Sequence, residues 1–198
     1  MEQENYEIEQ PSMDDLNGAD KNEYKMSKFA AQLMHGVDVD GHWFRIVKLN
    51  DQKYKDDPNR FEVDYGIERD GEIVGYIDPE EKTMWRSGEC KYPRINIPLY
   101  PMAHWKRGSF NGRHTNKLVR FSQKPDLSFW MGARTDYEAY IIVPFKTMIA
   151  HGTETTQGTR YTETPLPVIA VANEHCVFIY TEDDFIDYFI KEFKAWSS

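Results

Sequence analysis

Residues 63–82, VDYGIERDGEIVGYIDPEEK, contain two runs of alternating apolar and polar residues that flank an Arg-Asp-Gly. A period of two predicts β-strands with one apolar face, and Asp-Gly favours a hairpin turn. We therefore expect an antiparallel hairpin, with Asp64 in its first strand and Asp78 and Glu80 at the end of its second.

The length of the turn sets which carboxylates share a face. A two-residue Asp-Gly loop places Asp64 opposite Ile77 and points Asp64 and Asp78 to opposite sides. A three-residue Arg-Asp-Gly loop places Asp64 opposite Tyr76 and diagonal to Asp78, near enough for both carboxylates to reach one divalent cation. We prefer the three-residue loop because it gathers the apolar residues on the other face. The alternative is a solvated polar face of an edge hairpin.

The 198 residues correspond to about one domain, and we expect a loose acidic arm over residues 1–19 and a single domain over residues 20–198. The chain has no apolar run of about 18 residues, and its N-terminus is acidic, so we expect a cytoplasmic protein without a membrane partner. Cys90 and Cys176 lack a CxxC spacing, which favours buried free thiols.

The net charge of −9 argues against bulk attraction to nucleic acid, but the charge is unevenly distributed. Residues 90–125 contain no Asp or Glu and hold eight cations: Lys91, Arg94, Lys106, Arg107, Arg113, Lys117, Arg120 and Lys124. A polyanion would dock on this basic segment. The alternative is a basic surface that acidic neighbours compensate.

The remaining patterns predict an α/β (α+β mixed) fold, with helices flanking a central mixed β-sheet. We expect a helix after Asp20 and another capped by Thr181, with Phe185, Phe189 and Trp196 along one face. Strands are predicted over residues 41–49, 116–122 and 139–144, a short helix or turn over 126–133, a polar loop over 151–164, and a hairpin joining 167–172 to 176–180.

The order of helix, strand with Asp64, Asp-Gly turn and strand ending Asp78-Pro79-Glu80 resembles the PD-(D/E)xK nuclease superfamily, which has the restriction-endonuclease-like fold. In that family one strand carries a metal-binding Asp and the next a (D/E)-x-K triplet. The segments after the hairpin resemble virus- and microbe-encoded members. Position 80 departs from the pattern, because it holds Glu where the family has the Lys that positions and helps deprotonate the attacking water. Lys82 would supply the ammonium only by reaching back over the strand end.

The resemblance implies hydrolysis of DNA phosphodiester bonds with Mg2+ or Mn2+. Asp64, Asp78 and Glu80 would hold the metal, and Lys82 would complete the catalytic set. Glu23, on the predicted first helix, is a candidate outer ligand of the metal. The basic segment would bind the phosphate backbone through Lys106, Arg107, Arg113, Lys117 and Arg120, with Trp105 and Phe110 as further contacts. A homodimer is compatible with the family.

Three alternatives remain open. Glu89-Cys90-Lys91 is a literal E-x-K and an alternative catalytic pair of Glu89 and Lys91, ranked second because Pro93 interrupts the strand after it. His104, Asn111 and His114 loosely resemble the His-Asn-His nucleases, but at too short a spacing. A catalytically inactive nucleic-acid-binding or interaction protein on the same fold is the non-enzymatic alternative, and it would explain the missing lysine at position 80.

Overall fold

The computed structural model describes residues 30–49, 63–82, 90–99, 116–134, 139–159 and 162–198. Its ten strands form two sheets, and the bounds of the strands are β1 Val37–Val39, β2 His42–Lys48, β3 Tyr65–Arg69, β4 Glu72–Lys82, β5 Arg94–Pro98, β6 Ser128–Arg134, β7 Tyr140–Pro144, β8 Thr153–Thr159, β9 Thr162–Ala172 and β10 Val177–Ile179. The described helices are α2 Ala31–His35, α4 Lys117–Phe121, α5 Phe145–His151 and α6 Glu182–Ser197, with short 3-10 turns η2 Pro125–Leu127 and η3 Asn173–His175.

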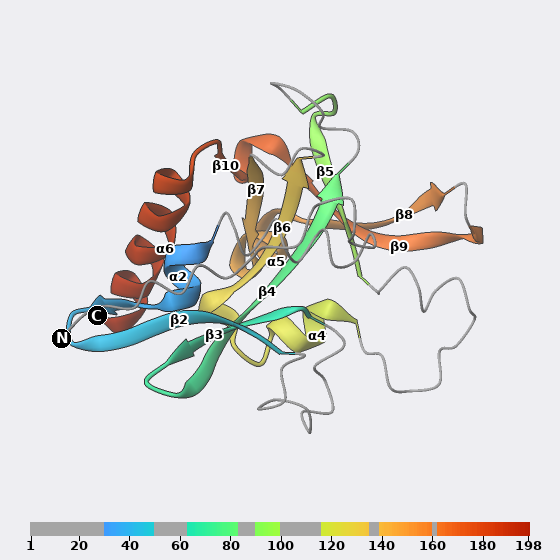
Figure 1. The fold of residues 1–198 in the computed structure, drawn as a ribbon. Helices are drawn as coiled ribbons and strands as arrows, with labels where there is room; N and C mark the ends of the chain where they lie inside the picture. The colour runs from blue at the N-terminus through green and yellow to red at the C-terminus, as the bar shows by residue number, and fades with distance from the viewer. Residues whose placement is uncertain (1–29, 50–62, 83–89, 100–115, 135–138, 160–161) are drawn as a thin grey trace, which may run out of the picture.

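The larger sheet has the order β1-β2-β3-β4-β6-β7-β10, and the smaller has the order β5-β9-β8. Among the described strand pairs, β4 and β6 are parallel and the others antiparallel. The larger sheet is therefore mixed, and the predicted class, a mixed sheet with helices packed against it, is confirmed (Figure 1).

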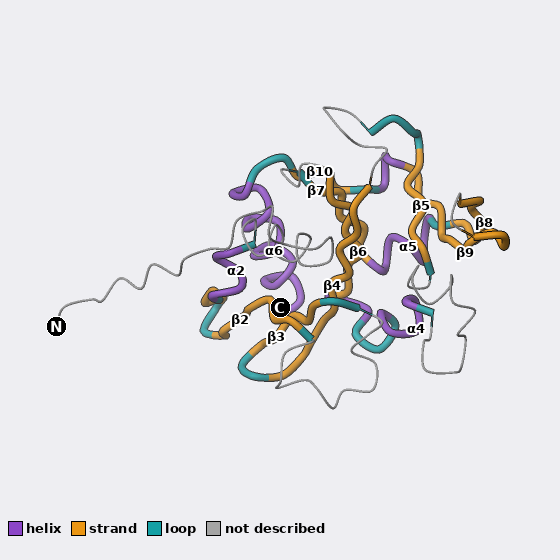
Figure 2. The backbone as a smooth tube through the Cα atoms, turned by 45° about the vertical axis from the view of Figure 1, so that its right-hand side comes forward, coloured by secondary structure: helices purple, strands orange, loops and turns teal. Residues whose placement is uncertain are grey.

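The strand β4 lies between the two halves of the molecule. Figure 2 shows α2 and α6 on one side of it and α4, α5 and the smaller sheet on the other. Apolar residues fill both sides. One buried cluster joins β2, β3, β6 and β7 to α2 and α6, and the other joins β6 and β7 to α4, α5, β5 and β9.

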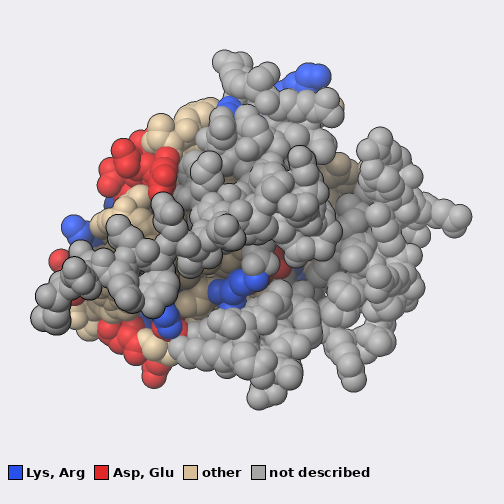
Figure 3. Space-filling view, in the orientation of Figure 1, with Lys and Arg blue, Asp and Glu red and all other residues tan. Residues whose placement is uncertain are grey.

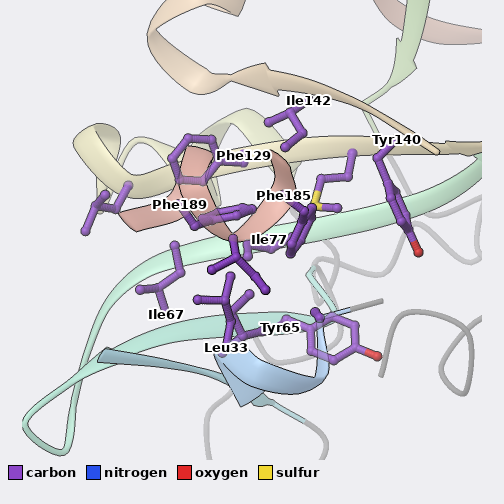
Figure 4. Close-up of a cluster of buried hydrophobic side chains, with 14 of the residues drawn as sticks. Leu33, Tyr65, Ile67, Ile77, Phe129, Tyr140, Ile142, Phe185 and Phe189 are labelled. Carbon is purple, nitrogen blue, oxygen red and sulfur yellow. The ribbon is translucent and has the colours of Figure 1, made fainter. Parts of the chain in front are cut away.

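The aromatic stripe of α6 accounts for the first cluster. Phe185, Phe189 and Phe193 recur every four residues and are fully buried in this cluster. Figure 4 shows Phe185 and Phe189 among the side chains of the cluster. Phe193 stacks on Phe44 with ring centroids 4.5 Å apart. The helix begins as predicted, because the Thr181 hydroxyl accepts the backbone N–H three residues later at 3.1 Å. Burial of each ring contributes roughly 1.5–3 kcal/mol.

The first turn of α6 carries Glu182, Asp183 and Asp184, which complement the positive end of the helix dipole. They form part of the acidic patch that Figure 3 shows over this end of the helix. Within the described residues, no helix combines the length and apolar character needed to cross a bilayer.

Several predicted elements were wrong. Residues 117–121 form a helix instead of a strand, because Asn116 caps it by accepting the Leu118 N–H at 2.8 Å. Residues 128–134 form the strand β6 instead of a helix or turn, and the predicted polar loop after His151 is the strand β8 paired with β9. The strands β9 and β10 belong to different sheets, so the predicted hairpin between them does not form. The predicted helix after Asp20 lies outside the described residues except for α2.

Candidate active site

The turn between β3 and β4 contains two residues, so the predicted three-residue loop was wrong. Arg69 pairs with Glu72, and the intervening Asp70 and Gly71 have φ of 49° and 95°. Two left-handed residues are typical of a type I′ hairpin turn. Asp70 is held there because its carboxylate accepts the Trp43 N–H at 2.8 Å, and the same bond is the main reason that the pKa of Asp70 is lowered.

A β-bulge in β4 brings Asp64 and Asp78 to one face, although the two-residue turn alone would have pointed them to opposite faces. Glu68 pairs with Ile73, but Ile67 pairs with Gly75, so β4 contains one extra residue at Val74. From the bulge onward the register continues to Tyr65 opposite Ile77. One further step along the same register places Asp64 opposite Asp78. Directly opposed residues of an antiparallel pair point to the same face, so Asp64 and Asp78 share one.

Glu80 lies on the same face of β4, two residues beyond Asp78. On the neighbouring strand β6, Asp78 pairs with Trp130 and Glu80 pairs with Gly132. Asp78 is buried, Glu80 is partly buried and Asp64 is exposed, so the three carboxylates run from the interior of the molecule to solvent.

The cation of this cluster comes from a distant part of the chain. Lys117 is the first residue of α4 and only 4% exposed, and its ammonium donates hydrogen bonds to Oδ2 of Asp78 and Oε1 of Glu80. It forms ion pairs with both carboxylates. The Lys117 backbone N–H is also anchored, donating to the carbonyl of Leu99 at 2.8 Å. The predicted site therefore contains a lysine, and it comes from position 117.

The helix α4 makes a second contact with β4 beside the Lys117 ion pairs. One turn after Lys117, the Arg120 guanidinium lies over the Tyr76 ring, 4.2 Å from its centroid. Tyr76 and Asp78 are two residues apart and therefore on one face of β4. Lys117 and Arg120 are three residues apart and therefore on one face of α4. The cation–π contact therefore fixes the helix in the position that delivers the ammonium to Asp78.

The electrostatics of the cluster follow from burial. Burial raises the pKa of Asp78 to about 7; the Lys117 charge opposes this increase, while Glu80 and Asp64 add to it. Burial alone would lower the pKa of Lys117, but the charges of Asp78 and Glu80 outweigh it and raise that pKa above its ordinary value. The charges of Asp78 and Glu80 therefore favour the protonated form of Lys117, and burial favours the neutral form of Asp78.

The carboxylate oxygens are of the kind that a divalent cation prefers, but the three carboxylates are not grouped closely enough in this structure to form a metal site. Three carboxylates face one ammonium, and a second cation would favour the ionised form of Asp78 that burial disfavours. In the part of the chain that the structure describes, no three His, Cys, Asp or Glu side chains are grouped closely enough to bind a metal ion. The residues that would hold the cation are Asp64, Asp78 and Glu80, and Lys117 already bridges two of them.

The other predicted site residues divide into three groups. Lys106, Arg107, Arg113, Glu89 and Glu23 lie outside the described residues, as does the side chain of Lys82. Lys91 and Arg94 are exposed, as a phosphate-binding segment requires. Lys117 and Arg120, predicted to bind phosphates, are instead buried against β4. The basic segment is therefore not one exposed surface, because Lys117 and Arg120 are on the inward side of α4.

The signal for Lys117 was present in the sequence but lay far from the hairpin. Asn116 precedes the apolar Leu118 and Phe121 at helical spacing, which is a helix start that places Lys117 in the first turn. Comparisons of the chain with protein-family models, with curated proteins and with solved structures found no match.

Proposed function

We propose that this protein is a nuclease that hydrolyses phosphodiester bonds of DNA with Mg2+ or Mn2+, on a restriction-endonuclease-like body. The observation that supports it is the buried Lys117 ammonium, which forms ion pairs with Asp78 and Glu80 of the strand β4. Asp64, which directly precedes the neighbouring strand β3, lies on the same face. Carboxylates with an adjacent lysine are the chemical groups of the PD-(D/E)xK pattern. The lysine missing from position 80 is supplied from α4.

In this proposal Asp64, Asp78 and Glu80 would hold the metal, which when bound would supply Lewis-acid chemistry toward the phosphate and a bound water. Lys117 orients the Asp78 and Glu80 carboxylates through its hydrogen bonds. Its ammonium lies beside the carboxylates, where it attracts the phosphate and positions the attacking water. Asp64, which is exposed, lies at the solvent side of the cluster, where a substrate would approach.

The basic segment supplies the binding surface in this proposal. Its described and exposed members, Lys91 and Arg94, precede and begin β5, and Lys124 is partly buried beyond α4. These cations would neutralise backbone phosphates, which gives an affinity that falls as salt concentration rises. The overall acidity of the chain would then restrict nucleic acid to this surface.

The test is cleavage of supercoiled plasmid and of single-stranded DNA by the purified protein in Mg2+, in Mn2+ and in chelator. Asp78→Asn and Lys117→Met should each lower the cleavage rate by about 100-fold or more, the usual loss for a group that acts on the attacking water. Lys194→Met changes an exposed lysine of α6 and should leave the rate unchanged. Binding of Mn2+, followed by electron paramagnetic resonance, should weaken in Asp78→Asn.

The second candidate function is nucleic-acid binding without catalysis, which the Lys117 bridge itself favours. An ammonium that already neutralises two carboxylates reduces their need for a metal. In that case the protein would bind DNA with the same salt dependence and would neither bind Mn2+ nor cleave in any metal. Absence of both activities in folded wild-type protein would reject the nuclease and leave the binding function.

A further inference from the structure

The two cysteines lie where the strands β5 and β9 separate. The ladder between these strands ends with Arg94 opposite Ala172. Just beyond it the Asn173 N–H donates to the Pro93 carbonyl at 3.0 Å, which continues the same register by one residue. Cys90 lies three residues before Pro93, and Cys176 lies three residues after Asn173. The turn η3 begins at Asn173, and the Cys176 N–H donates to the Asn173 carbonyl at 3.0 Å, so Asn173 is bonded both to the approach to β5 and to Cys176.

Contacts beyond the ladder keep the two segments together. The Asn173 side chain donates to the Tyr92 carbonyl at 2.6 Å, so two consecutive residues before β5 are bonded to one residue at the start of η3. After η3 the Cys176 thiol donates to the Ala172 carbonyl at 3.4 Å, which folds the chain back toward β9.

The thiols share one environment. Both are free and partly buried, and both pack against the same apolar cluster. Burial raises the pKa of Cys176 to about 12, and the nearby Cys90 adds to the increase. Packing against one cluster places the two thiols near each other. The bonds of Asn173 to Tyr92, Pro93 and Cys176 hold the two cysteine segments together, and a disulfide joins Cα atoms about 4.4–6.8 Å apart.

We propose that Cys90 and Cys176 are a site of intramolecular disulfide formation, with a low-molecular-weight disulfide such as oxidised glutathione as the oxidant. The Cys90 thiolate attacks one sulfur of the oxidant, forms a mixed disulfide and releases one reduced glutathione. The Cys176 thiolate then attacks the Cys90 sulfur, forms the protein disulfide and releases the second glutathione. Two protein thiols lose two hydrogens and two electrons, which reduce one oxidised glutathione to two reduced molecules.

The cross-link would tie the approach to β5 to the connection between β9 and β10. It closes a loop that contains β5, α4, β6 and β7. A loop of this length restricts the unfolded chain, so we expect the melting temperature of the oxidised protein to rise by roughly 5–10 °C. The inference does not depend on the proposed nuclease activity.

The test incubates the folded protein in glutathione redox buffers, quenches with acid and alkylation, and maps the cysteines by mass spectrometry. The expected product of wild type is a monomer lighter by two hydrogen atoms, with the peptides of Cys90 and Cys176 linked. Cys90→Ser and Cys176→Ser cannot close the ring. Accumulation of glutathione adducts in wild type, or cross-linking between two chains that increases with protein concentration, would overturn the proposal.

A third variant tests the geometry. Asn173→Ala keeps both thiols but removes the side-chain bond to Tyr92, so the equilibrium constant for ring closure should fall several-fold. Ser122→Ala, on an exposed residue after α4, is the control and should close as wild type does. An unchanged constant in Asn173→Ala would contradict the placement of the cysteines on which the proposal rests.

Discussion

Replacement of Lys117 by Met tests whether the ammonium balances the carboxylates of the candidate site. The substitution keeps an unbranched side chain in the buried space and removes the charge. In the wild type the ammonium forms ion pairs with both Asp78 and Glu80. The variant leaves two carboxyl groups beside each other without a cation, and Asp78 is 4% exposed. Loss of one partner of a buried ion pair typically costs about 3–5 kcal/mol in the free energy of unfolding.

The pH dependence of this loss follows from Asp78. Its pKa is raised from 3.8 to about 7 on folding, so the folded state holds more protons than the unfolded state between these values. Stability therefore falls as pH rises from about 4 to 7, by about 4 kcal/mol in total, and is level above pH 7. In Lys117→Met the Asp78 pKa is higher, so the fall continues above pH 7. The gap between variant and wild type then widens by up to about 1.4 kcal/mol per pH unit.

The assay is urea unfolding followed by tryptophan fluorescence, from pH 5 to pH 9 in the presence of a chelator. Lys194→Met, an exposed lysine of α6, is the matched control and should track wild type at every pH. The triple variant with Asp78→Asn, Glu80→Gln and Lys117→Met has no buried charge to balance, so its stability should not depend on pH through this site. A stability loss in Lys117→Met that is the same at pH 5 and pH 9 would refute the reasoning.

Three further predictions concern the supports of the site and of α6. Gly75→Ala places a Cβ 2.1 Å from the carbonyl oxygen of Leu127, so its free energy of unfolding in urea should be lower by about 1–3 kcal/mol; wild-type stability would contradict the close packing at the bulge. Thr181→Ala removes the cap of α6 and should cost about 1 kcal/mol in the same measurement, whereas Thr181→Ser should retain most of it. Arg120→Met and Tyr76→Leu should show a coupling of about 1 kcal/mol in a double-mutant cycle, and additive effects would argue against the cation–π contact.

Local sequence patterns predicted those features of the fold that depend on neighbouring residues. The hairpin of β3 and β4 was predicted from alternation and from Asp-Gly, and α6 from its cap and its aromatic spacing. The buried strand β7 was predicted from its continuous apolar run. Each of these signals is contained within a few turns or a few pairs, so the chain encodes them without reference to distant segments.

The elements that were predicted wrongly depend on contacts with distant segments of the chain. Residues 117–121 include the β-forming Val119 and Phe121, but the Asn116 cap and the contact of Arg120 with Tyr76 favour a helix. The polar strand β8 has an exposed threonine-rich sequence, and it becomes a strand because β9 supplies its hydrogen bonds. Propensity alone does not decide such segments, because their stability comes from partners elsewhere in the chain.

Local sequence patterns were sufficient to predict that Asp64, Asp78 and Glu80 belong to one hairpin. That the three share a face, and that Lys117 contacts two of them, depends on tertiary packing. The turn alone would have separated the two aspartates; the bulge at Val74 sets the register that brings them together. A bulge and a contact between residues 39 positions apart depend on how β4 packs between β3, β6 and α4, and short-range patterns do not contain that information.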